Sequence, residues 1–214
     1  MTPIIQALWA AEAAEDLIRD TVTGSQDDLQ ETITVTLPAY QTNDTVVLCL
    51  RLASASSDIV TPAGWVERSQ RSSSGNSAVL TRVMEAGDGA TVTIEHVGSD
   101  RRAAWTAYAI VGARAVEAAQ ASSPPALTPA GGEMETLWIT FASMRTSNNG
   151  VDAVPEHYGE LLMASNGFDS STAYCRAASA HRVHAADSET PGAWVFSGTT
   201  DSVHYHTVSV RPQP

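Results

Sequence analysis

Histidines come closest, among the residues of this chain, to a spacing that supports chemistry. His181 and His184 lie three residues apart in HRVH, and His204 and His206 lie two apart in HYH. Side chains two apart on a strand point to the same face, and three or four imidazoles that meet in space can hold Zn²⁺. These four residues are therefore the candidate metal ligands.

A structural role is the alternative for two of these histidines. Val208 and Val210 continue the strand face of His204 and His206, which indicates the edge of a core. No cysteine or carboxylate completes a known ligand pattern around the histidines. We therefore expect no bound metal and no other cofactor.

Motifs for nucleophilic or phosphate chemistry are absent from the sequence. There is no GxSxG elbow, no Walker loop and no GxGxxG motif after a strand. No pair of carboxylates stands out as the acid and nucleophile of a glycosidase. We expect a protein that is not an enzyme, and a hydrolase with a cryptic site is the remaining catalytic alternative.

Two aromatic residues are the candidate binding residues. Trp65 follows Pro62 by three positions, and Tyr158 follows Pro155 by three. Aromatic residues in a β-protein usually belong to the core. On the rim of a sandwich, they would instead stack on a sugar ring or anchor a protein contact.

Charge and composition limit the partners. The 214 residues carry a formal net charge of −12, and 43% are hydrophobic. An acidic surface without a basic stripe disfavours nucleic acid and anionic membranes, and no stretch is long and apolar enough for membrane insertion. We see no signal peptide. Cys49 and Cys175 fit no metal-ligand spacing, so we expect buried thiols, with one disulfide across the sandwich as the alternative.

The elements that must position these residues are mostly strands. Residues 3–20 are Ala- and Glu-rich with apolar residues near helical spacing, which predicts a short helix within an N-terminal arm at 1–32. The alternative is a helix or strand that covers one end of the core. From residue 33, short β-branched and aromatic segments alternate with Gly, Ser and Asp turns, which is typical of an antiparallel sandwich. We therefore predict an all-β domain over 33–214.

The second half repeats the order of the first, with pseudo-repeats at 33–112 and 125–212 and a linker at 113–124. Four pairs of segments carry this match: 44–52 with 135–144, 62–65 with 155–158, 77–85 with 171–179, and 99–112 with 200–212. The second copy is longer, and we assign the extra length to a loop around 181–193. Each half has an apolar face that packing against the other would bury. This predicts one jelly-roll-like sandwich, and two small sandwiches in series are the alternative.

The first half resembles a module of virion proteins from tailed bacteriophages. The module has a buried strand after an acidic turn, a PxGW element, an alternating strand, a Ser/Gly-Ser turn and a final Ala-rich strand. The matching parts are 44–52, 62–65, 79–86, 91–96 and 101–111. The resemblance covers 33–112 well and 125–212 weakly, because PxGW becomes PEHY in the second half.

The resemblance implies a minor tail, tail-fibre or head-decoration protein that acts in assembly or host-surface contact. Its partners would be other virion proteins and copies of itself, and its place would be the virion. The alternative is a carbohydrate-binding module for receptor recognition or adhesion, with Trp65 as its first candidate residue.

Overall fold

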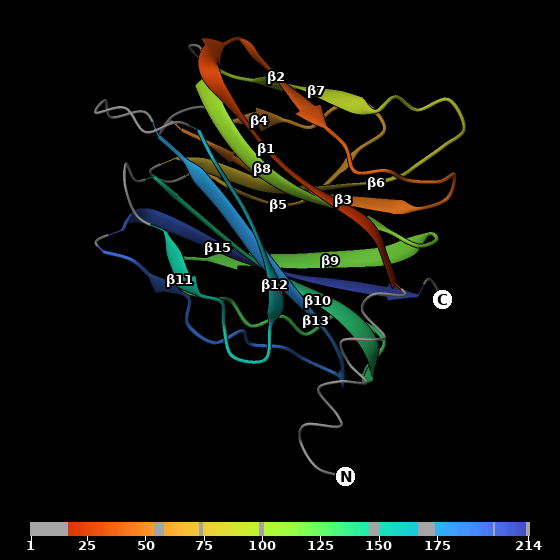
Figure 1. The fold of residues 1–214 in the computed structure, drawn as a ribbon. Helices are drawn as coiled ribbons and strands as arrows, with labels where there is room; N and C mark the ends of the chain where they lie inside the picture. Colours follow the sequence, from red (N-terminus) through yellow and green to blue (C-terminus); the bar gives the residue numbers. More distant parts are fainter. Residues whose placement is uncertain are drawn as a thin grey trace.

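A computed structural model describes most of the chain and shows an almost entirely β protein. The described residues are 17–53, 58–72, 75–98, 101–145, 150–166, 174–198 and 200–212. Every pairing between its strands is antiparallel, and the sheets stack in layers (Figure 1). The predicted all-β antiparallel sandwich is confirmed. No helix in the described part of the chain is long and apolar enough to span a bilayer.

The first half of the chain forms a five-stranded and a three-stranded sheet. The larger has the order β1-β8-β3-β6-β5 and the smaller the order β2-β7-β4. The strands are β1 (Ile18–Gln30), β2 (Thr32–Thr36), β3 (Thr45–Leu52), β4 (Ile59–Val60), β5 (Val66–Arg71), β6 (Asn76–Val83), β7 (Thr91–His96) and β8 (Arg101–Ile110). The continuous apolar run of β3 is buried along its whole length, because the sheet is covered on both faces.

The second half forms a five-stranded sheet and a two-stranded one. The larger has the order β12-β13-β10-β15-β9, and β11 pairs with β14. The strands are β9 (Arg114–Ala121), β10 (Met134–Arg145), β11 (Val151–Ala153), β12 (Gly159–Ser165), β13 (Arg176–Ala186), β14 (Val195–Phe196) and β15 (Asp201–Pro212). Read from its other edge, this sheet has the same connectivity as β1-β8-β3-β6-β5, so the two halves share one strand order.

Three apolar clusters hold the layers together. The central cluster draws on both halves, with Val47, Val79 and Tyr108 beside Phe141 and Val208. A second cluster lies between the large sheet of the first half and β2-β7-β4. The third covers the outer face of the second large sheet. The two halves are therefore not independent domains. They share an inner core, and each half covers its own outer face with its own strands.

The predicted segment boundaries need correction. Residues 18–30, within the predicted arm, form strand β1, which pairs with β8 and closes one edge of the sheet. Leu17 and Ile18 pack against the central core, so the predicted helix does not extend over 18–20. Its part at 3–16 lies outside the described residues. The predicted linker at 113–124 is largely strand β9, which pairs with β15 along its whole length.

One segment of the predicted repeat was matched in the wrong register. Val66 and Gly159 follow the equivalent turns, and they face Thr81 and His181 across the sheet. Thr81 and His181 therefore correspond, and the counterpart of Ser77, four residues earlier, is Ala177 and not Ser171. The extra length of the second copy consequently falls between β12 and β13, and not around 181–193, where residues to 186 belong to β13.

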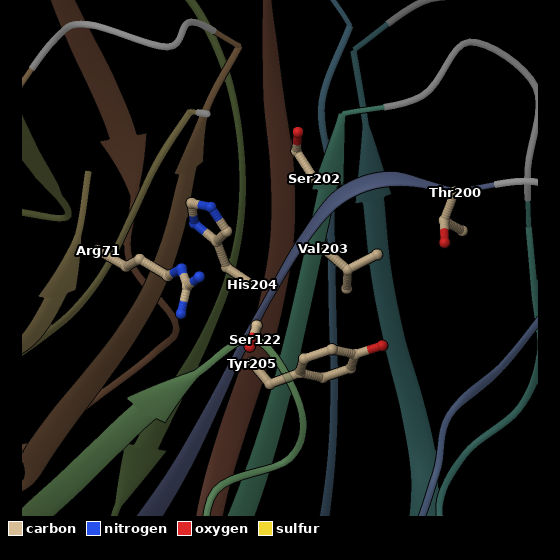
Figure 2. A pocket seen from close by; sticks show the side chains of 7 residues that line it. All are labelled: Arg71, Ser122, Thr200, Ser202, Val203, His204 and Tyr205. Carbon is tan, nitrogen blue, oxygen red and sulfur yellow. The ribbon is translucent and has the colours of Figure 1, made fainter. Parts of the chain in front are cut away.

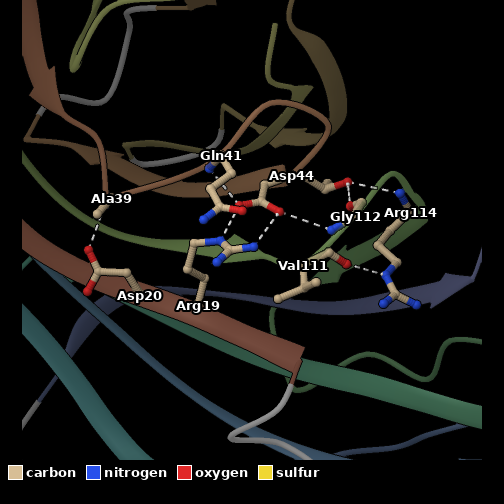
Figure 3. A network of polar contacts seen from close by, with 9 residues as sticks. Arg19, Asp20, Ala39, Gln41, Asp44, Val111, Gly112 and Arg114 are labelled. Atoms are coloured by element: carbon tan, nitrogen blue, oxygen red, sulfur yellow. Dashed lines mark hydrogen bonds and ion pairs between the residues drawn. The ribbon is translucent and has the colours of Figure 1, made fainter. Parts of the chain in front are cut away.

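The buried carboxylate of Asp44 links three segments of the first half. Asp44 accepts hydrogen bonds from Arg19 Nε (2.5 Å), from the backbone amide of Gln41 (2.7 Å) and from that of Gly112 (3.1 Å), as Figure 3 shows. Burial alone would raise the pKa of Asp44, but these donors lower it below its ordinary value. The contacts join β1, the start of β3 and the turn after β8. Glu135, which the sequence match pairs with Asp44, is exposed.

Both cysteines are buried free thiols in the central core. Burial raises the pKa of each thiol to about 12. The prediction of buried thiols is confirmed, and the alternative of a disulfide is wrong.

Candidate functional site

A surface hollow lies at the junction of the two halves. Strand β9 pairs with β15 only from Tyr205 onward, so β15 runs past the end of its neighbour there. The open hollow at this point has a volume of about 430 Å³. Its lining residues are Arg71, Ser122, Thr200, Ser202, Val203, His204 and Tyr205 (Figure 2).

Strand alternation places different chemistry on the two sides of β15. His204 is buried and points inward, with Arg71 of β5 on the same side in Figure 2. Val203 and Tyr205 lie on the other side of the strand, and the half-buried ring of Tyr205 packs against the outer cluster of the second half. One wall of the hollow is therefore cationic and the other carries an aromatic ring.

A chain of hydrogen bonds runs beneath the hollow and sets the tautomer of His204. Arg51 Nη1 lies 2.7 Å from His204 Nδ1, and a guanidinium can only donate, so His204 is neutral and carries its proton on Nε2. Ser77 Oγ lies 3.0 Å from the same Nδ1 and 2.8 Å from His206 Nε2. Ser77 therefore links the two imidazoles. On the other side of His206, Ser69 Oγ lies 2.7 Å from Nδ1.

Burial keeps His206, a member of this series of hydrogen bonds, in its neutral form. Burial, with smaller contributions from the neighbouring His204, Arg51 and Arg71, lowers the pKa of His206 to about 3. A histidine with such a pKa is a weak base near neutral pH. The contact between Ser69 and His206 therefore supports structure and binding better than activation of a nucleophile.

Arg51 is the buried cation behind the hollow. Its side chain is fully buried and donates to the carbonyl of Ser202 at 3.2 Å as well as to His204. Burial lowers its pKa to about 10, and the charges of Arg145 and Arg71 act in the same direction. Gly75 makes room for it, since a Cβ there would lie 2.3 Å from Arg51 Nη2.

The four candidate metal ligands do not converge. His204 and His206 share Ser77, whereas His181 contacts the Tyr108 ring edge-on and lies 3.6 Å from Glu160. His184 is exposed on β13. The described part of the chain contains no group of three or more His, Cys, Asp or Glu side chains that could hold a metal. His204 and His206 are buried, and Val208 and Val210 continue their face into the core.

The two candidate binding aromatics occupy equivalent turns but are buried. The amide of Trp65 donates to Pro62 O at 3.0 Å, and that of Tyr158 donates to Pro155 O at 3.1 Å. Trp65 is only 8% exposed and Tyr158 only 7%. Arg182 lies 5.0 Å from the centre of the Tyr158 ring. Both rings belong to the cores, so neither offers an open platform for a sugar.

Sequence reasoning missed the residues that hold this junction. Arg51 lies in the predicted buried strand TVVLCLRL, and a buried charge needs polar partners. The arginine within this apolar run therefore indicates a buried polar network. Arg71, Ser69 and Ser77 gave no comparable signal, because their proximity to His204 arises from the packing of the two halves.

Comparisons with known proteins identify no relative. No family model, no curated protein and no solved structure matches this chain.

Proposed function

We propose that this protein is a structural component of a tailed-phage virion, in the tail, a fibre or the head decoration. The proposal starts from the resemblance of the first half to a virion module. The observation that carries it is the recurrence of the PxGW turn as PEHY in the second half, with the same backbone hydrogen bond and a buried aromatic. A duplicated module with a shared core suits a rigid element that presents surfaces to neighbours.

The strand order supports jelly-roll character in the first half. Strands β1, β3, β6 and β8 lie in one sheet, and β2, β4 and β7 lie in the other. The chain thus crosses repeatedly between two layers, as in the double Greek key of jelly rolls. Strand β5 departs from a strict alternation, since it pairs with β6.

Mass spectrometry of purified particles tests the proposal. The protein should be present at a fixed ratio to the major capsid or tail-tube protein, in a copy number that matches the particle symmetry. Its absence from washed particles, with the protein found only in the lysate, would contradict the proposal.

The N-terminal residues are the proposed docking element. A deletion should stop at residue 16, because β1 begins at Ile18 and Arg19 binds Asp44. We expect a folded protein that no longer joins the particle. Normal incorporation would refute this part of the proposal.

The second candidate function is carbohydrate binding in receptor recognition. Trp65 and Tyr158 do not favour it, because they are buried. The hollow favours it instead, since it combines the Tyr205 ring with hydroxyl groups and the guanidinium of Arg71. A glycan array with wild-type protein and Tyr205→Leu tests it, and identical profiles would count against binding at the hollow.

A further inference from the structure

We propose that two copies of this protein pair through the outer edge of strand β12, in antiparallel orientation about a two-fold axis beside Leu162. The inference goes beyond the virion role, which does not say how neighbouring copies meet. It names the strand that pairs and the side chains that would lie across the contact.

The first argument is the position of β12 at the end of a large sheet. That sheet has the order β12-β13-β10-β15-β9, and among the described strands β12 pairs with β13 alone. The amide of Asn166, just after β12, donates to Cys175 O at 3.3 Å on the β13 side. Alternation therefore turns the amides of Met163 and Ser165 away from β13. Outward backbone groups of this kind are what an added strand binds.

The second argument is the scarcity of charge on β12. Charged side chains commonly protect an edge strand against pairing with another chain. Each of the other edge strands in the two large sheets carries two or more such residues. They are Arg19, Asp20, Asp27 and Asp28 on β1, Glu67, Arg68 and Arg71 on β5, and Arg114 and Glu117 on β9. Strand β12 carries only Glu160, near its start.

The third argument is the apolar surface that β12 exposes. Leu161 is 38% exposed and Met163 is 40% exposed, two positions apart on one strand. Among the described edge strands of the two large sheets, β12 alone exposes two large apolar side chains, since β1 exposes Leu29, β5 exposes Val66 and β9 exposes none. Contact with a second strand would remove this apolar surface from water, which favours pairing.

The fourth argument is that the pattern on β12 is self-complementary. Leu161 and Met163 lie on either side of Leu162. Antiparallel pairing about a two-fold axis at Leu162 therefore places Leu161 against Met163 of the second copy, and does so twice. Such a contact uses the same strand on both copies, so it closes at a dimer, and the charged edge strands disfavour further growth of the sheets. A second copy is therefore the partner that fits β12.

Sedimentation equilibrium of the full chain, at protein concentrations of about 1–100 µM, tests the proposal. Wild type should show a reversible equilibrium between monomer and dimer. Met163→Lys should weaken the dimer at least about tenfold, since symmetry brings two lysines into one apolar contact. Val66→Lys is the control, because it places the same charge at an exposed apolar position of edge strand β5. This variant should dimerise like wild type.

Paired substitutions test the register of the two strands. In Leu161→Glu/Met163→Lys, each copy would place a glutamate against a lysine of the other. This double variant should therefore dimerise more tightly than Met163→Lys alone. Leu161→Lys/Met163→Lys has only like charges across the contact, so it should stay monomeric. The melting temperature of each variant confirms folding.

Hydrogen exchange of wild type provides a second measurement that needs no variant. The amides of Met163 and Ser165 should exchange more slowly at high protein concentration than at low concentration. Three results would overturn the proposal: a wild type that stays monomeric, open-ended oligomers in place of a dimer, and a dimer that Met163→Lys leaves unchanged. Particle composition tests the virion proposal separately, and neither outcome decides the other.

Discussion

The neutral, buried His206 predicts a specific loss of stability in mild acid. Its pKa is about 3 in the folded protein and about 6.5 in an unfolded chain. Between these values the unfolded state binds the proton and the folded state does not, so stability falls as the pH drops below about 6.5. The loss continues until the pH approaches the folded value.

The size of this effect at pH 5 follows from the unfolded pKa. The 1.5 units between 6.5 and 5 correspond to about 2 kcal/mol, at 1.36 kcal/mol per unit. A folded pKa one unit higher would hardly change this figure, because it would still lie below pH 5. The expected cost is large against a typical total stability of about 5–15 kcal/mol.

The assay compares urea unfolding at pH 7, 6 and 5, followed by tryptophan fluorescence. His206→Gln removes the titration while it keeps a donor and an acceptor for Ser77 and Ser69. The variant should lose about 2 kcal/mol less than wild type between pH 7 and pH 5. His184→Gln is the control, because His184 lies exposed on β13, and it should follow wild type. Equal slopes for wild type and His206→Gln would refute the reasoning.

The remaining predictions concern the first-half carboxylate and the paired turns. Asp44→Asn should lower the free energy of unfolding by about 2 kcal/mol in urea melts at pH 7, because it weakens hydrogen bonds to a charged acceptor. The control Glu135→Gln, at an exposed carboxylate of the second half, should change it little. Since the pKa of Asp44 is lowered, its contribution is present above the ordinary carboxyl pKa and is lost as the pH falls through the folded value, and Asp44→Asn should flatten this acid limb. His157 has a φ of 70°, so His157→Gly should raise stability by about 0.5–1 kcal/mol. Gly64→Ala should lower the melting temperature, since φ is 79° and a Cβ would lie 2.4 Å from Arg82 Nη1.

Strong local patterns were enough to predict much of the fold. The continuous run of β3, the alternating β7 and the matched ends of β8 and β15 were all identified from the sequence. The two prolines that precede an aromatic by three positions marked equivalent turns, although the second has histidine where the first has glycine. These features are local, so neighbouring residues encode them.

The segments that failed are edge strands formed by tertiary contacts. Strand β9 reads RAVEAAQA, which has weak strand propensity, yet it pairs along β15 because that strand offers a free edge. Strand β1 contains Gly24, where a Cβ would lie 2.4 Å from the Trp105 ring. The position of β1 beside β8 depends on this close approach, and no local sequence pattern predicts it.

The candidate site was only partly accessible from the sequence for the same reason. The alternation of His204 and His206 predicted a common face, and both side chains do point inward. Their partners Ser69, Ser77 and Arg51 come from the first half. Only the packing of one half on the other brings these groups together.

Differential scanning calorimetry of the full chain tests most directly whether the two halves share one core. Wild type should unfold in a single transition with equal calorimetric and van't Hoff enthalpies. Phe141→Leu, which alters the central cluster from the second half, should shift that single transition as a whole. Two resolved transitions, with only one moved by the substitution, would contradict the account.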